Sequence, residues 1–190
     1  MGLAAGETTQ AAAARTLSYP VAILVGMADH DAYAPVDTPM GPVFVAWNDH
    51  GVCRVEPGAD AARFEAGFEA LFGRPVSRSE GPPPGVAADP DVAIDWRGVP
   101  DFDRTVLVAI RAIPAGDAWT YGEVAEAIGK PGAARAVGGA LGRNRVPVIV
   151  PCHRVVAAGG LGGFGLGLEA KRALLAAEGY PAVEQGRLLP

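Results

Sequence analysis

A cysteine, a histidine and an arginine stand side by side at Cys152, His153 and Arg154, directly after Pro151. A cysteine reacts as its thiolate, and a neighbouring imidazole or cation favours that form. Because proline cannot donate to a strand ladder, we expect a strand over Val148–Val150 to end there and to leave the cysteine accessible to a substrate. The pattern indicates a nucleophile. The alternative is a buried cysteine that packs as a small apolar group.

The composition of the chain limits the classes to which it can belong. It has 190 residues, 49% of them hydrophobic, and a net charge of −5, which is typical of a globular protein with one core or two small domains. Its two cysteines make no disulfide framework, which favours a reducing, cytoplasmic location. The histidines are too scattered for a zinc cluster, so we expect no metal and no cofactor. No apolar run reaches about 18 residues, and we expect no membrane span.

Basic residues gather in one part of this acidic chain. The segment 130–154 contains no acidic residue, and its basic residues are Lys130, Arg135, Arg143, Arg145 and Arg154. A basic patch of this kind is what a small phosphate-contacting surface needs. An ordinary solvated face would give the same pattern.

The first half of the chain is expected to contain a small α/β domain over 37–95, after a partly disordered extension over 1–36. Strand-like runs at 43–47 and 52–55 flank a glycine-containing hairpin turn. Phenylalanine and leucine at helical spacing predict a helix over 61–72, which ends at a glycine.

The second half, residues 96–182, is expected to be mainly helical and to be followed by a tail over 183–190. Helices are expected over 102–113, 120–129, 133–141 and 168–178, and the second of them begins with a capping box formed by Thr120 and Glu123. The two middle helices are joined by a tight turn, which is a helix-turn-helix pattern. Such pairs also occur in proteins that never contact DNA.

The helix over 133–141 is unusually slim, because apart from Arg135 it carries mostly alanine and glycine. Adjacent glycines such as Gly138 and Gly139 cost about 1 kcal/mol each in a helix relative to alanine. This composition is expected where something approaches the helix closely, either a second helix or a DNA groove. A glycine-rich loop over 159–167 lacks the sequence of a phosphate-binding loop, but it could bring backbone N–H groups close to a ligand.

Several motifs occur in the order found in one protein family: Thr120-Tyr121-Gly122-Glu123, Ala134-Arg135-Ala136-Val137-Gly138-Gly139-Ala140, Arg143-Asn144, Pro151-Cys152-His153-Arg154-Val155-Val156, and Leu174-Leu175 with Glu178-Gly179. With these motifs the chain closely resembles the methylated-DNA–protein-cysteine methyltransferases, the O6-alkylguanine-DNA alkyltransferases of direct DNA repair. The match is dense over about residues 100–180 and weak over residues 39–85.

The resemblance implies an α+β fold, with a ribonuclease H-like N-terminal domain built on an antiparallel sheet and a helical C-terminal domain containing the helix-turn-helix. It implies a monomer that binds double-stranded DNA through the minor groove. The protein would move an alkyl group from O6 of guanine, with O4 of thymine as a second substrate, onto its own cysteine after the nucleotide leaves the stack. A thioether is stable, so each molecule would react once.

The resemblance also implies roles for individual residues. Cys152 would accept the alkyl group, His153 would deprotonate it through a bound water, and Glu178 would orient the histidine. Asn144 would hold the turn that carries the cysteine. Tyr121 would donate toward N3 of the base, and Arg135 would replace the flipped base in the stack. The other residues expected to contact base or DNA are Ala136, Gly138, Val155, Phe164 and Gly165.

Some positions depart from the family. Phe164 stands where many members have tyrosine, which removes a hydroxyl from the pocket loop. Leu166 stands where a smaller residue is common, which predicts a pocket narrowed to small alkyl groups. The chain has no cysteine-rich zinc module.

The residues leave three other functions open. They are a lesion-binding protein without transfer activity, a helix-turn-helix regulator, and a cysteine hydrolase.

Overall fold

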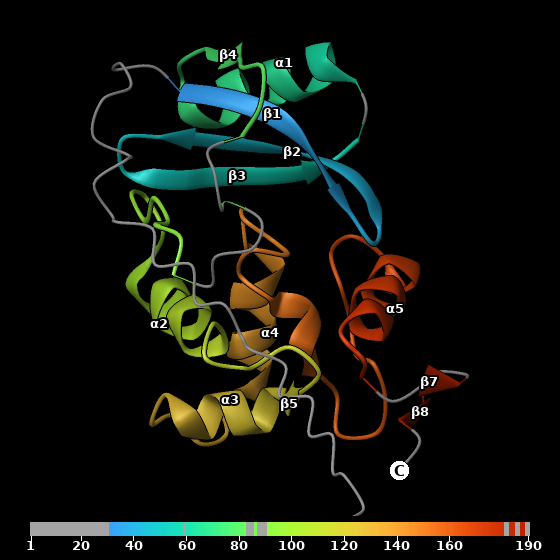
Figure 1. Cartoon of the computed structure of the whole chain (residues 1–190). Coiled ribbons are helices and arrows are strands. Elements are labelled where there is room, and N and C mark those ends of the chain that lie inside the picture. The colour runs from blue at the N-terminus through green and yellow to red at the C-terminus, as the bar shows by residue number, and fades with distance from the viewer. Residues whose placement is uncertain are drawn as a thin grey trace, which may run out of the picture.

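The computed structural model describes residues 31–58, 60–82, 86, 91–180, 183–184 and 187–188. It has a four-stranded sheet with one helix on its outer face and the remaining helices beneath it (Figure 1). The strands are β1 (Asp31–Thr38), β2 (Gly41–Asn48), β3 (Gly51–Pro57) and β4 (Val76–Arg78), in the order β3-β2-β1-β4. β1, β2 and β3 form antiparallel pairs in sequence order.

The two expected strands and the turn between them are confirmed. Gly51 begins β3 at φ 123°, and a Cβ there would lie 2.3 Å from the Ala93 carbonyl oxygen, so only glycine fits. Two expectations need correction. β1 begins at Asp31, so residues 31–36 belong to the sheet and not to the N-terminal extension, while residues 1–30 lie outside the described part of the chain. β4 pairs with β1 in parallel, so the sheet is mixed. A ribonuclease H-like topology stays a prediction.

The outer face of the sheet is covered by α1 (Ala61–Phe72), which has the bounds that the sequence predicts. The Asp60 side chain accepts from the N–H of Arg63 at its start, and Gly73 ends it in the left-handed conformation. Phe64 and Phe68 of α1 form one buried cluster with Tyr33 and Phe44 of the sheet. This cluster anchors α1 to one face of the sheet.

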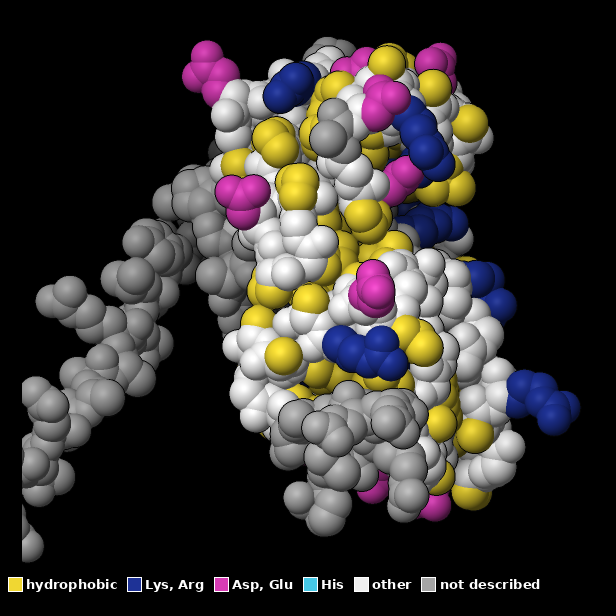
Figure 2. Space-filling view, turned by 90° about the vertical axis from the view of Figure 1, so that its right-hand side faces the viewer, with side chains coloured by type: hydrophobic (Ala, Val, Ile, Leu, Met, Phe, Trp, Pro, Cys, Tyr) yellow, Lys and Arg dark blue, Asp and Glu magenta, His cyan; other side chains and the backbone are white. Residues whose placement is uncertain are grey.

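The inner face of the sheet shares its hydrophobic core with the helices below. Alternate residues of β2 and β3, such as Val45 and Val52, pack in one cluster with Val106, Ile110 and Val137. The sheet and the helical half are therefore joined by a continuous core. Hydrophobic side chains are also visible at the surface along this junction (Figure 2).

The helical half contains α2 (Asp101–Ile110), α3 (Tyr121–Ala127), α4 (Ala134–Gly142) and α5 (Leu168–Ala177). α2 ends three residues before the expected bound at residue 113, because the next three N–H groups donate to carbonyls three residues back, in a tighter turn that leads to Pro114. The capping box at the start of α3 is confirmed. α3 and α4 pack together across a short turn, and their assignment as a helix-turn-helix stays a prediction.

Short strands complete the fold. β5 (Trp119–Thr120) pairs in parallel with β6 (Val155–Val156), and the expected tail contains a small hairpin formed by β7 (Val183–Glu184) and β8 (Arg187–Leu188). Within the described ranges, none of the helices combines the length and the apolar character needed to cross a bilayer.

Candidate active site

The segment that leads to Cys152 is a turn and not the expected strand over Val148–Val150. The backbone N–H of Val150 donates to the carbonyl of Val146 over 2.9 Å, and Val148 has a φ of 74°. This left-handed conformation is strained for a β-branched residue. The turn is favoured because the Asn144 side chain forms the backbone hydrogen bonds that a neighbouring strand would otherwise provide. Its side chain accepts from Val146 N–H at 3.0 Å and donates to the Val150 carbonyl at 3.0 Å.

Cys152 begins a short 3-10 helix, η2 (Cys152–Arg154), and is only 7% exposed. The Asn144 side-chain amide lies 3.2 Å from its sulfur and donates to it. Burial raises the pKa of the Cys152 thiol, while the Asn144 amide and the positive charge of Lys171 act in the opposite direction. Asn144 therefore links the shape of the turn to the ionisation of the thiol.

The imidazole of His153 binds Glu178, the residue that follows α5. Its Nε2 lies 2.9 Å from Oε1 of Glu178, and the imidazole is 1% exposed. The other ring nitrogen, Nδ1, is buried and has no hydrogen-bond partner among the described residues. The contact with Glu178 fixes the orientation of the ring and leaves Nδ1 as the nitrogen that can exchange a proton with the site.

Arg154 acts on Glu178 and not on the thiol. Its guanidinium donates to both carboxylate oxygens of Glu178, at 3.0 and 2.9 Å, and to the carbonyl of Ile113 at 2.6 Å. Burial alone would raise the pKa of Glu178, but the hydrogen bonds from His153 and Arg154 outweigh it and lower the pKa to about 2. The carboxylate is therefore charged at neutral pH.

Lys171 of α5 is part of the site, and the sequence motifs do not predict this. The side chain is fully buried, and its ammonium donates to the carbonyls of Val155 and Leu161 at 2.6 Å and of Gly163 at 3.2 Å. Burial lowers its pKa to about 8. The signal was its position on the same helical stripe as Leu174 and Glu178, at spacings of about three and seven residues.

A cavity of about 190 Å³ opens beside the cysteine. Its wall is formed by residues from α3, α4, η2 and the glycine loop: Tyr121, Gly138, Leu141, Gly142, Cys152, Gly163, Phe164 and Gly165. Tyr121, Gly138, Phe164 and Gly165 were expected to contact the base or DNA. Leu166 is not among the lining residues, so the expectation that it narrows the pocket is not supported.

The glycine loop closes against Tyr121. The Tyr121 hydroxyl lies 3.4 Å from the carbonyl of Gly163. Gly162 has a φ of 68°, and a Cβ at this position would lie 2.9 Å from the tyrosine ring. Only glycine allows this close contact between loop and ring. Val155, in contrast, does not line the cavity, and its carbonyl accepts from Lys171.

α4 presents Arg135 and Ala136 to solvent, outside the cavity. A Cβ on Gly138 would lie 3.7 Å from the Tyr121 ring, which is an ordinary contact. Close packing inside the protein therefore does not explain Gly138. The expected basic patch is smaller than the sequence suggests, because Arg143 pairs with Asp103 and Arg154 with Glu178. Arg145 donates to backbone carbonyls, and Arg143 is exposed but paired, so Lys130 and Arg135 are the exposed basic residues of the segment that have no ion pair among the described residues.

A buried cysteine beside a cavity, next to a histidine held by a glutamate, defines a protein that works through a nucleophilic thiol. The family model for the 6-O-methylguanine DNA methyltransferase DNA binding domain matches residues 101–180. The methylated-DNA–protein-cysteine methyltransferase of Mycobacterium bovis is 39% identical over 154 residues, 77% of this chain and 91% of that protein. The chain belongs to the methylated-DNA–protein-cysteine methyltransferase family.

Other relatives agree. The Mycolicibacterium paratuberculosis member is 53% identical over 89 residues, which are 46% of this chain and 53% of that protein. The crystal structure of Mycobacterium tuberculosis OGT in complex with DNA has a TM-score of 0.60 at 36% identity, over 77% of this chain and 92% of that one. The O6-methylguanine-DNA methyltransferase of Pyrococcus kodakaraensis has a TM-score of 0.58 at 28% identity, over 78% and 99% of the two chains.

Proposed function

We propose that this protein repairs O6-alkylguanine in DNA by irreversible transfer of the alkyl group to Cys152, once per molecule. The observation that carries the proposal is the position of the Cys152 sulfur, which lies at the wall of the cavity and accepts a hydrogen bond from Asn144. In the reaction the sulfur attacks the alkyl carbon, a C–S bond forms, and the C–O6 bond breaks with its electrons moving to guanine. Because a thioether is chemically stable, the cysteine is not regenerated and the molecule does not react again.

Proton transfer prepares the nucleophile. His153 has its Nε2 on Glu178 and its Nδ1 without a protein partner, which suits a histidine that accepts the thiol proton through one bound water. Glu178 stabilises the imidazolium that forms, because its carboxylate stays charged at neutral pH. Asn144 and Lys171 also favour the thiolate, through the amide hydrogen bond and the positive charge.

The guanine base would occupy the cavity between Tyr121 and the glycine loop. The Tyr121 hydroxyl would donate toward N3 of the base, and the Gly165 N–H toward O6. A hydrogen bond or proton given to the base makes it a better leaving group. The carbonyls of Cys152 and Val155 would accept from the exocyclic amine. Each already accepts one hydrogen bond, from the Val155 N–H and from Lys171 respectively, and a carbonyl oxygen can accept two.

The base reaches the cavity only after it leaves the duplex. We propose that α3 and α4 act as a helix-turn-helix whose second helix lies in the minor groove, with Arg135 filling the gap left by the flipped nucleotide. Two observations support this: Arg135 and Ala136 are exposed, and the space beside Gly138 is not needed for internal packing. A helix this slim fits a narrow groove.

The test uses duplex DNA with radiolabelled O6-methylguanine. We expect one methyl group per chain, bound to Cys152, and none in Cys152→Ser. The matched control is Cys53→Ala, which removes the other cysteine and should transfer normally. Multiple turnovers, or label retained by Cys152→Ser, would exclude the mechanism. A parallel duplex with O4-methylthymine shows whether that base is a second substrate.

A further inference from the structure

The edge strand of the sheet, β3, forms a backbone hydrogen bond with the turn that contains Asn144. β3 is an edge strand, and its backbone pairs with two later segments of the chain. The N–H of Val52 donates to the Ala93 carbonyl at 2.8 Å, and the N–H of Val55 donates to the Arg145 carbonyl at 2.7 Å. Arg145 directly follows Asn144 in sequence. The sheet therefore fixes the backbone beside the residue that contacts the Cys152 sulfur.

The Arg145 side chain makes a second connection to the same edge. Its guanidinium donates to the carbonyl of Gly98 at 3.1 Å and to that of Arg97 at 3.5 Å. It also lies over the ring of Phe72, the last residue of α1, at 5.6 Å from the ring centroid. Arg145 thus bridges the end of α1, the segment that leads into α2, and the turn before Cys152.

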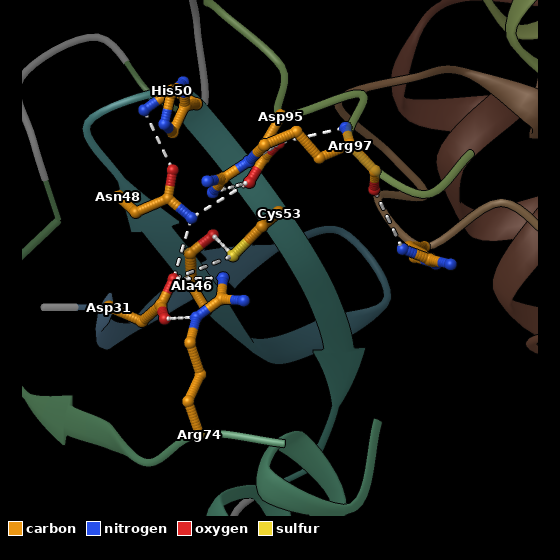
Figure 3. A network of polar contacts seen from close by, with 9 residues as sticks. Asp31, Ala46, Asn48, His50, Cys53, Arg74, Asp95 and Arg97 are labelled. Carbon is orange, nitrogen blue, oxygen red and sulfur yellow. Dashed lines mark hydrogen bonds and ion pairs between the residues drawn. The ribbon is translucent and has the colours of Figure 1, made fainter. Parts of the chain in front are cut away.

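The surface that receives Arg145 is held by a polar network (Figure 3). Arg97 pairs with Asp95, and Asn48 joins Asp95 at 3.0 Å to Asp31 at 2.7 Å. Arg74 pairs with Asp31 and lies over the same Phe72 ring as Arg145, at 5.2 Å. Both carboxylates are buried and have lowered pKa values despite burial, because the arginines and Asn48 bind them. The network closes on itself, which makes it a rigid support.

We propose that Arg145 is a positioning residue that couples the sheet to the acceptor cysteine, by holding Asn144 with its amide on the Cys152 sulfur. This inference rests on the proposed role of Cys152 as the acceptor. If Arg145 is replaced, the turn loses the hydrogen bonds and the ring contact of this side chain, while residue 144 is still an asparagine. The amide would then donate to the sulfur less of the time, and the thiolate would form at higher pH.

Other groups also face the sulfur, and the substitution leaves them unchanged. They are Tyr121 from α3 and Lys171 from α5, while His153 of η2 is the neighbour of Cys152 in sequence and binds Glu178. None of them contacts Arg145 in a hydrogen bond or ring contact among the described residues. A change in thiol ionisation in Arg145→Met can therefore be traced to the turn.

The experiment measures the rate at which iodoacetamide modifies Cys152 as a function of pH, with peptide mapping by mass spectrometry. Arg145→Met is compared with Arg145→Lys, which keeps the charge, and with Arg104→Met, which removes an exposed arginine from α2. Asn144→Ala and the double variant complete a cycle. Because no DNA or alkylguanine takes part, failure of the proposed repair reaction would not affect this result.

We expect Arg145→Met to raise the pH midpoint of Cys152 modification by about half a unit to one unit, which lowers the rate at neutral pH about threefold to tenfold. Arg145→Lys should fall between it and wild type, and Arg104→Met should match wild type. The double variant should shift no further than Asn144→Ala. The proposal is overturned if Arg145→Met lowers the melting temperature without moving the midpoint, or if the two shifts add. If Asn144→Ala does not fold, the comparison of the midpoints of Arg145→Met, Arg145→Lys and wild type decides.

Discussion

Arg154 and Glu178 are joined at two points, with Nε of Arg154 3.0 Å from Oε2 and Nη2 2.9 Å from Oε1. Oε1 also accepts from His153, so one carboxylate is shared between a structural cation and the histidine beside the cysteine. A two-point arginine–carboxylate contact fixes the plane of the carboxylate. The orientation of His153 therefore depends on Arg154, a residue adjacent to it in sequence that reaches the same partner.

Glu178→Gln should make the free energy of unfolding depend less on pH in the acidic range. In the folded protein the pKa of Glu178 is lowered from 4.5 to about 2, so its carboxylate contributes stability that is complete above pH 4.5 and is lost as the pH falls toward about 2. We expect the unfolding free energy of the variant to fall less over this interval than that of wild type. Urea unfolding at neutral pH and across the interval measures both curves. Parallel curves would contradict the assignment.

Lys171→Met should destabilise the protein, because the buried carbonyls of Val155 and Leu161 lose the ammonium that donates to them. We expect a loss of about 3 kcal/mol, the upper part of the range for unsatisfied buried polar groups. The control is the neighbouring Arg172→Met, which is exposed and should stay within about 0.5 kcal/mol of wild type. Urea unfolding at neutral pH compares the two. Equal stability of the variants would show that the lysine does not hold the loop.

Cys53 should be inert toward alkylating agents in the folded protein. Burial, together with the charges of Asp31 and Asp95, raises the pKa of its thiol to about 12, and the side chain does not reach the cavity. We expect iodoacetamide at mildly alkaline pH to modify one cysteine in the native protein and two after denaturation. Intact-mass measurement counts them. Modification of Cys53 in the native state would mean that the sheet opens on the timescale of the reaction.

Gly162→Ala should disturb the wall of the cavity. The new Cβ would sit 2.9 Å from the Tyr121 ring, at a residue with a φ of 68°. We expect a loss of about 1–2 kcal/mol from the backbone conformation alone, and slower reaction with a free alkylated base because Tyr121 must move. Gly163→Ala is the control for stability, since a Cβ there meets open space. Thermal unfolding of the two variants should differ by several degrees in midpoint. Similar midpoints would show that the loop adapts.

Arg135→Ala should slow repair of duplex DNA far more than reaction with a free alkylated base. The residue is exposed on α4 and does not line the cavity, so its removal leaves the chemistry near Cys152 intact. The control, Arg104→Ala, removes an exposed arginine from α2. Rates of alkyl transfer from both substrates test the idea. Equal slowing on both would exclude a role for Arg135 in flipping the nucleotide.

The sequence alone determined the features that depend on near neighbours. The bounds of α1, the capping box at Thr120 and the turn before Gly51 follow from spacing, capping residues and glycine. It also identified Cys152 as the candidate nucleophile, because its neighbours in the chain are unusual. These features form from interactions within a few residues, which the order of residue types already contains.

Only the tertiary structure decided which distant groups meet. The segment over 148–150 is a turn because Asn144 satisfies its backbone, although its valines favour a strand. Most of the basic run 130–154 is tied to Asp103, Glu178 and backbone carbonyls instead of lying free at the surface. Lys171 can be buried because three backbone carbonyls, one from β6 and two from the glycine loop, accept from its ammonium. The reason is physical: a buried polar group must find a partner, and the fold decides which one is within reach.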